Sequence, residues 1–159
     1  MKKTLLILVA VVFAVTACEK QTYVDGTYEA TFDEPHFGWT EYLSFELVGD
    51  EISNVDFDAV NAEGDLKSTD DAYNERMFTD SAYVARMEEA GKAPTKPETY
   101  MPQIEGALMN ATIAPEFTPI DIVSGATSSS ENANALMEAA LDLAADGDGT
   151  EIVISYPEE

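Results

Sequence analysis

Three segments in the first half of the chain alternate apolar and polar residues, which is the pattern of a half-buried β-strand. The alternation runs over residues 27–32, then 42–48, and then 55–59. Gly49-Asp50 separates the second segment from the third, and such a pair is typical of a two-residue hairpin turn. The first half of the chain therefore predicts an antiparallel sheet.

The middle of the chain predicts a helix that follows a polar loop. Tyr73, Met77, Val84 and Met87 stand at helical spacing between residues 71 and 90, and Ser68 or Asp70 can serve as the N-cap. A break is expected near residue 80, and Gly91 ends the helical pattern. Pro94 and Pro97 then predict an extended stretch, and Pro102 predicts the first turn of a shorter helix.

A longer helix and a final strand complete the pattern. Ser128 and Glu131 have the spacing of a capping box, so the helix is predicted to begin at Ser128. Its apolar face comprises Ala133, Leu136, Met137, Ala140, Leu141 and Ala144. After Gly147, residues 151–156 read as a strand. This order of elements predicts a single α+β domain in which helices pack on a small antiparallel sheet.

The N-terminus has the composition of a targeting segment. Lys2 and Lys3 precede an apolar run over residues 5–15, which is too short for an ordinary membrane-spanning helix. Small residues then lead to Cys18, in a pattern that resembles the lipobox of bacterial lipoproteins. Because Cys18 is the only cysteine, no intramolecular disulfide can form. We expect residues 1–17 to be removed and Cys18 to be lipidated, the alternative being a buried thiol.

The charge of the chain excludes one class of partner. The formal net charge is −23, and it becomes −25 without residues 1–17, which carry two lysines and no acidic residue. Such a surface repels nucleic acid, so no nucleic-acid partner is expected. Two interpretations of the acidity remain open: it keeps the protein soluble, or it attracts a cationic redox partner.

Residues 121–127 read Asp-Ile-Val-Ser-Gly-Ala-Thr and lead directly into the predicted long helix. Backbone N–H groups at the start of a helix have no partner inside it, and the helix dipole is positive there, so phosphate binds well. Gly125 can adopt positive φ, and the small side chains of Gly125 and Ala126 allow a ligand to approach the backbone. The alternative is a solvated capping loop without a ligand.

The same seven residues resemble the flavinylation signature of FMN-binding domains. In that family the last threonine, here Thr127, carries FMN through a phosphoester bond that a flavin transferase makes from FAD. Further resemblance covers residues 25–28, 38–39, 41–42, 66–68 with positions in 70–77, and 100–105, and overall it spans roughly residues 23–145. Related domains are subunits of sodium-pumping NADH:quinone oxidoreductases and ferredoxin:NAD oxidoreductases, and others are stand-alone lipoproteins of extracellular electron transfer.

The resemblance implies a set of residues around FMN. These candidate cofactor-binding residues are Thr127, Asp121, Ser124, Gly125, Ala126, Ser128, Lys67 and Tyr73. Lys67 would contact the flavin phosphate or a ring carbonyl, or would be a solvated lysine. Tyr73 would lie beside the flavin, or would be ordinary core. Asp121 would orient the loop, hold the metal of the transferase, or simply form a turn. The single histidine, His36, has no companion at metal-ligand spacing, so no metal site is expected.

The resemblance therefore implies an electron carrier rather than a stand-alone enzyme. The expected organisation is a signal peptide at 1–17, a lipidated tether at 18–24 and an FMN-binding domain at 25–157, anchored outside the cytoplasm. Its partners would be a flavin transferase and a membrane electron donor, either quinone-linked or NADH-linked. No Gly-x-Gly-x-x-Gly sequence for a nicotinamide cofactor is present. The alternative function is a surface lipoprotein that binds FMN or another ligand non-covalently without redox activity.

Overall fold

The computed structural model describes residues 22–157, which fold as one α+β domain. The strands are β1 (Gly26–Phe32), β2 (Thr40–Val48), β3 (Glu51–Val60) and β4 (Glu151–Ile154), and the helices are α1 (Asp71–Thr79), α2 (Ser81–Glu89), α3 (Pro97–Met109) and α4 (Thr127–Asp146). The predicted signal peptide and Cys18 lie outside the described residues. No helix within the described part of the chain is long and apolar enough to cross a membrane.

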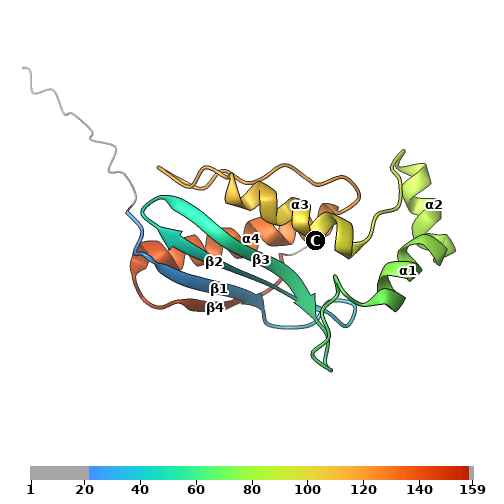
Figure 1. Cartoon of the computed structure of the whole chain (residues 1–159), viewed down its shortest axis with the longest axis horizontal. Coiled ribbons are helices and arrows are strands. Elements are labelled where there is room, and N and C mark those ends of the chain that lie inside the picture. The colour runs from blue at the N-terminus through green and yellow to red at the C-terminus, as the bar shows by residue number, and fades with distance from the viewer. Residues whose placement is uncertain (1–21, 158–159) are drawn as a thin grey trace, which may run out of the picture.

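The four strands form one sheet in the order β3-β2-β1-β4 (Figure 1). The two pairs β1–β2 and β2–β3 are antiparallel, as the hairpin signals predicted. The strand β4 instead joins the edge of β1 in parallel, with Ala30 opposite Ile152. The sheet is therefore mixed, because α4 crosses over the sheet before β4 and returns the chain in the direction of β1.

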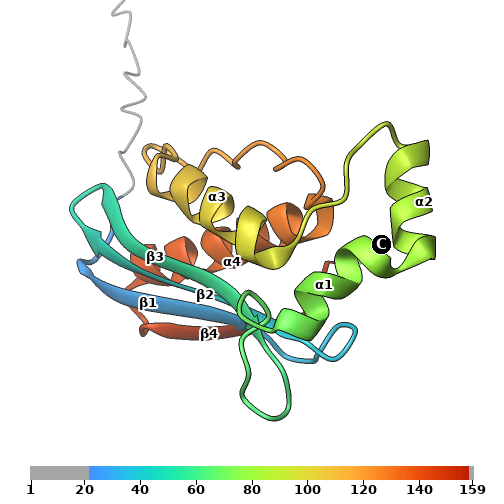
Figure 2. The ribbon, with the colours of Figure 1, turned by 45° about the vertical axis from the view of Figure 1, so that its right-hand side comes forward.

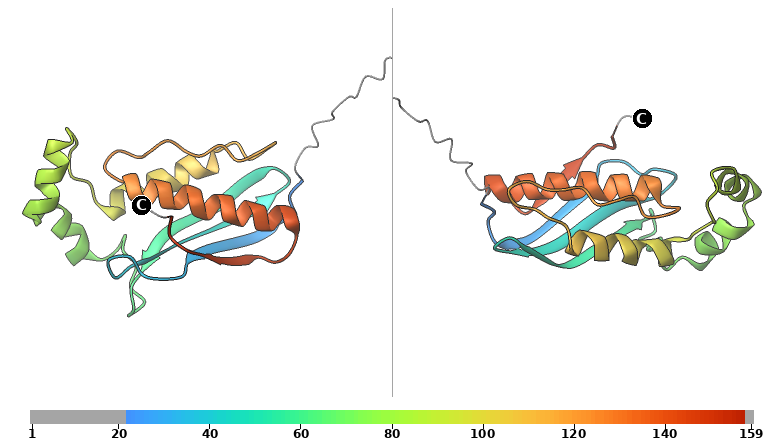
Figure 3. Two further views of the ribbon diagram at one scale, coloured as in Figure 1. Left: turned by 180° about the vertical axis from the view of Figure 1, so that it is seen from behind. Right: turned by 90° about the horizontal axis from the view of Figure 1, so that it is seen from above.

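Helices α3 and α4 cover one face of the sheet (Figures 2 and 3). Alternate residues of the central strands point into this layer, where Ala30, Leu43, Phe45 and Phe57 are fully buried. The apolar face of α4 is confirmed: all six residues predicted for it are buried. The α+β class is thus confirmed, and burial of these alternating side chains provides the main driving force for folding.

Helices α1 and α2 form a separate pair beyond one end of the sheet (Figure 1). Asp70 is the N-cap of α1 and accepts from the backbone N–H of Tyr73, as predicted. Asp80 lies between the two helices and caps α2 by accepting from the N–H groups of Ala82 and Tyr83. Because Asn74 is the only fully buried residue of either helix, polar contacts rather than an apolar core hold the pair.

Two helix starts differ from the sequence predictions. Helix α3 begins at Pro97 rather than at Pro102, which lies inside the helix. Proline at the first position costs no hydrogen bond, and the face of α3 that buries Met101, Ile104 and Leu108 outweighs the bond that Pro102 cannot make.

The predicted capping box at Ser128 is also wrong. Helix α4 begins at Thr127, its N-cap is Ala126, and no side chain caps it. The neighbouring serines are used elsewhere. The Ser130 hydroxyl donates to the carbonyl of Ala126 and accepts from the N–H of Val123, while Ser129 donates to a carboxylate of the sheet.

The core placement can be checked by comparing two phenylalanines. Phe45 is fully buried and its ring lies 5.9 Å from that of Tyr28, whereas Phe78 on α1 is 51% exposed. Phe45→Ala should lower the free energy of unfolding by about 3–5 kcal/mol, and Phe78→Ala by less than about 0.5 kcal/mol. Urea unfolding of both variants measures this difference, and equal effects would contradict the assigned core.

Candidate functional site

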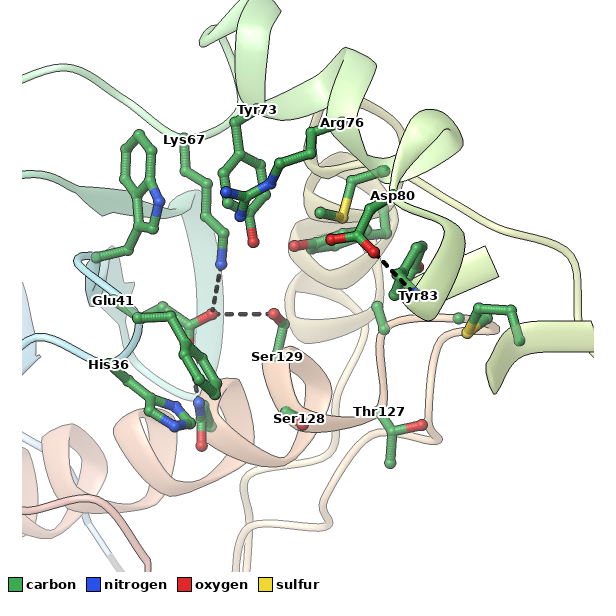
Figure 4. A pocket seen from close by; sticks show the side chains of 18 of the residues that line it. His36, Glu41, Lys67, Tyr73, Arg76, Asp80, Tyr83, Thr127, Ser128 and Ser129 are labelled. Carbon is green, nitrogen blue, oxygen red and sulfur yellow. Dashed lines mark hydrogen bonds and ion pairs between the residues drawn. The ribbon is translucent and has the colours of Figure 1, made fainter. Parts of the chain in front are cut away.

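A cavity of about 500 Å³ lies between the start of α4, the end of the sheet and the α1–α2 pair (Figure 4). This volume is in the range of small-molecule sites. The residues around it come from distant parts of the chain: His36, Phe37, Trp39, Glu41, Lys67, Tyr73, Arg76, Met77, Asp80, Tyr83, Arg86, Met87, Lys92, Tyr100, Gly125, Ala126, Thr127, Ser128, Ser129, Asn132 and Tyr156.

Thr127 is the first residue of α4 and lies at one end of the cavity. The first main-chain bond of the helix runs from the N–H of Ser130 to the carbonyl of Ala126, so the N–H groups of residues 127–129 have no carbonyl within the helix. The side chain of Thr127 is exposed, and Lys92 Nζ lies 3.5 Å from its Oγ1. A reachable hydroxyl therefore sits beside a cation and a helix N-terminus, where an anion is stabilised.

Gly125 is required by the geometry of the turn before Thr127. Its φ is +80°, and a Cβ at this position would lie 2.6 Å from Thr95 Cγ2 and 3.3 Å from the terminal carbon of Met87. Any larger residue would thus be strained and would push against the segment that follows α2. The glycine of the predicted motif keeps the start of α4 close to that segment.

A buried carboxylate forms the floor of the cavity. Glu41 of β2 is 5% exposed and accepts from Ser129 Oγ at 2.9 Å and from Asn132 Nδ2 at 2.6 Å. Lys67 Nζ lies 3.9 Å from the same carboxylate (Figure 4). The Ser129 hydroxyl and the Asn132 amide are neutral donors. Within the described residues, the positive charge that compensates this buried carboxylate comes from the ammonium of Lys67.

Aromatic side chains form the walls. The rings of Trp39 and Tyr73 meet edge to face with centroids 5.4 Å apart. The ring of Tyr73 also has two cations near it, Lys67 Nζ at 5.2 Å and Arg76 Cζ at 4.9 Å from its centroid. Tyr100 also lines the cavity and is buried, which raises the pKa of its hydroxyl. Flat apolar walls of this kind suit a planar aromatic ligand.

The cations of this acidic protein gather at the cavity. Residues 22–157 contain five lysines and arginines, and four of them, Lys67, Arg76, Arg86 and Lys92, line it. The fifth, Lys96, pairs with Glu98 instead.

Two acidic residues also line the cavity, and both are engaged by the protein itself. Glu41 accepts from Ser129 and Asn132. Hydrogen bonds from the backbone N–H groups of Tyr83 and Ala82 lower the pKa of Asp80. The cavity therefore has an excess of positive charge, unlike the protein as a whole, and fits an anionic ligand.

Six of the eight candidate cofactor-binding residues come together here. Lys67 and Tyr73 lie in the same cavity as Gly125, Ala126, Thr127 and Ser128, although about 50 residues of chain separate the two groups. Asp121 and Ser124 do not line it, and both are exposed in the loop before α4. Asp121 instead borders a shallow surface depression formed with the end of α3.

Several lining residues were not singled out by the sequence analysis. They are Phe37, Glu41, Arg76, Asp80, Tyr83, Arg86, Lys92, Tyr100, Ser129, Asn132 and Tyr156. The scarcity of basic residues could have identified Arg76, Arg86 and Lys92, since a rare cation in an acidic chain needs a reason. The alternation of β2 could have identified Glu41, which stands in phase with the buried Leu43 and Phe45. Among the described residues, no three His, Cys, Asp or Glu side chains are placed to hold a metal ion.

Comparisons with known proteins place the chain among lipoproteins. It is 30% identical over 138 residues to the 15 kDa lipoprotein of Treponema pallidum (strain Nichols), an alignment that covers 86% of this chain and 87% of that protein. The crystal structure of the CPE2226 protein from Clostridium perfringens is similar, with a TM-score of 0.67 and 26% sequence identity over 85% of this chain and 99% of that one. No model of a known protein family matches the chain.

The Glu41 network generates a prediction about stability. Glu41→Ala should lower the free energy of unfolding by about 2–4 kcal/mol, because it leaves the buried Ser129 and Asn132 donors without their acceptor. Glu29→Ala is the matched control, since Glu29 is an exposed glutamate on the adjacent strand β1, and it should change stability by less than about 0.5 kcal/mol. Urea unfolding distinguishes the two, and a Glu41 variant as stable as the control would refute the network.

Proposed function

The chain belongs to the family of the 15 kDa lipoprotein of Treponema pallidum, and from this premise we propose that it is a membrane-anchored flavoprotein that carries FMN on Thr127 and transfers electrons. The observation that carries the proposal is the gathering of four cations around a cavity that ends at an exposed threonine hydroxyl. Since no family model matches, the flavin assignment depends on the motif at residues 121–127 and on the chemistry of this cavity.

The residues of the cavity fit both parts of FMN. At one end, Lys92 and the free N–H groups at the start of α4 supply the positive charge and donors that a phosphate requires. Trp39 and Tyr73 supply aromatic surface for a flat ring, and Lys67 adds a cation beside them. A phosphate alone would not need the aromatic walls, and a neutral aromatic ligand would not need the cations.

The attachment requires only a reachable hydroxyl. The Thr127 oxygen forms a bond to the FMN phosphorus of FAD, the pyrophosphate bond breaks, AMP leaves, and the hydroxyl proton is released. An external flavin transferase supplies the catalysis, so the chain itself needs no catalytic base beside Thr127. The exposure of Thr127 supports this role, since a buried hydroxyl would be closed to another enzyme.

A covalent link suits a protein that works outside the cytoplasm. The proposed anchor is Cys18, whose lipid chains would hold the protein at the membrane after residues 1–17 are removed. Any FMN that dissociated there would be diluted and lost, whereas a phosphoester bond retains it. FMN bound in this way would supply one- and two-electron chemistry between a quinone-linked or NADH-linked membrane donor and an acceptor. The protein contributes position and electrostatics.

The direct test is the mass of the protein after co-expression with a flavin transferase. The wild-type protein should gain the mass of FMN minus water, and Thr127→Ala should gain nothing because the attacking oxygen is absent. Thr69→Ala is the matched control, since Thr69 is an exposed threonine that does not line the cavity, and it should be modified like the wild type.

Two results would count against the proposal in different ways. Wild-type protein that stays colourless and unmodified would refute covalent flavinylation. Protein that is yellow when native but shows no flavin fluorescence after denaturing electrophoresis would instead establish the alternative, a surface lipoprotein that binds FMN non-covalently.

Lys92 provides a test of the phosphate end. Lys92→Gln should weaken non-covalent binding of FMN to unmodified protein about tenfold, because it removes a charge-assisted contact beside Thr127. Lys96→Gln is the matched control, since it removes the same charge from a residue that pairs with Glu98 outside the cavity. Fluorescence titration measures both, and equal weakening would show that only net charge matters.

A further inference from the structure

The segment between β1 and β2 carries a tight hairpin at the mouth of the cavity. His36 and Trp39 pair through two main-chain hydrogen bonds, of 2.8 Å and 3.1 Å, so that Phe37 and Gly38 form a two-residue turn. Both turn residues have positive φ, +52° for Phe37 and +85° for Gly38, which is the pattern of a type I′ turn. Such turns favour Asn-Gly, and phenylalanine is an unfavourable residue at the first position.

Phe37 is unfavourable in a second respect. It is 86% exposed, the most exposed of the large hydrophobic residues in the described part of the chain. A bulky residue in the left-handed region costs about 1–2 kcal/mol, and a large apolar side chain in water adds nothing to folding. The chain thus holds a phenylalanine where an asparagine would be more stable, and strain of this kind often marks a functional position.

The ring of Phe37 is the outer end of a column of rings that rises from the core. Phe32 is buried and stacks on Tyr156 at 3.8 Å, and Tyr156 lies 5.3 Å from His36. His36 in turn stacks on Phe37 at 4.2 Å. Since Phe37 is almost fully exposed, one face of its ring is covered by His36 and the other remains uncovered beside the cavity.

The column lies at the far end of the cavity from the attachment residue. Figure 4 shows His36 and Thr127 at opposite sides of the cavity, with Ser128 and Ser129 between them. A ligand fixed by its phosphate at Thr127 would therefore extend its ring system along the cavity toward the hairpin.

We propose that Phe37 is a ring-contact residue, which stacks on the planar aromatic ring of the bound ligand and shields it from water. This inference rests on the proposed function, and it adds a residue that the flavin motif does not include. The ligand ring becomes the next member of the column Phe32–Tyr156–His36–Phe37. Stacking on an exposed ring adds apolar burial and the favourable geometry of offset aromatic pairs, which offsets the strain at Phe37 only when the ligand is present.

The test compares stability and flavin contact in the same variant. Phe37→Asn creates the Asn-Gly pair that type I′ turns prefer, so it should raise the Tm of the ligand-free protein by about 2–5 °C. It should also weaken non-covalent FMN binding by about 3–10-fold and make the flavin of flavinylated protein more accessible to quenching by iodide. Phe37→Tyr keeps an aromatic ring and should retain the FMN affinity and the iodide quenching of the wild type.

Phe78→Asn is the control, because it removes another exposed phenylalanine, one that does not line the cavity. It should leave FMN affinity and iodide quenching unchanged. If the wild-type protein binds FMN and Phe37→Asn shows the same FMN affinity and the same iodide quenching, this inference is overturned and the proposed function stays intact. Wild-type protein that binds no FMN, covalently or otherwise, would overturn both.

Discussion

A hydrogen-bonded carboxylate in the middle of the molecule determines where α4 begins relative to the sheet. Glu41 stands on β2 and receives the hydroxyl of Ser129 and the amide of Asn132, both in the first two turns of α4. Burial of the apolar face of α4 stabilises its packing on the sheet, but the hydrophobic effect itself has no direction. The two directional bonds to Glu41 fix its position, and with it the place of Thr127 at the end of the cavity. The ammonium of Lys67 compensates the buried charge and becomes part of the site.

The distribution of charge follows from the same arrangement. An acidic surface repels a phosphate-bearing ligand at long range. Four of the five cations in residues 22–157 lie around the cavity, against two carboxylates, so the lining carries an excess of positive charge. Contacts over a few ångströms in a partly buried site are screened far less by salt than the remote surface charges are. At contact distance the local cations can therefore favour an anionic ligand although the rest of the surface is acidic.

The sequence predicted the elements better than it predicted their ends and contacts. Alternation at residues 42–48 and the period of the α4 face were sufficient for strand and helix, because each reflects burial of one side of the element. The parallel direction of β4 could not be predicted from its own pattern, since alternation is the same in either direction. Ser128 and Glu131 had the right spacing for a capping box, but tertiary contacts of the neighbouring serines decided the helix start.

Some of the residues that line the cavity were predicted and others were not. Lys67 and Tyr73 were inferred from a family resemblance, and folding does bring them to the cavity that ends at Thr127. Glu41 was missed because a glutamate ordinarily faces water, although it stands in phase with Leu43 and Phe45 on the buried face of β2. Its hydrogen-bond partners on α4, some 90 residues later, could not be predicted from the local sequence.

The structure of the α1–α2 pair explains why a permanently bound ligand would benefit the protein. Tyr73, Met77, Tyr83 and Met87 are only half buried and face the cavity, and neither helix has an apolar core of its own. A planar ligand between this pair and α4 would bury these side chains and supply the packing that the pair otherwise lacks. Whatever binds the folded state in this way also stabilises it, by an amount that grows with ligand occupancy. A ligand held by a covalent bond at Thr127 would keep that occupancy complete at any dilution, so that the wall of the cavity and its occupant would stabilise each other.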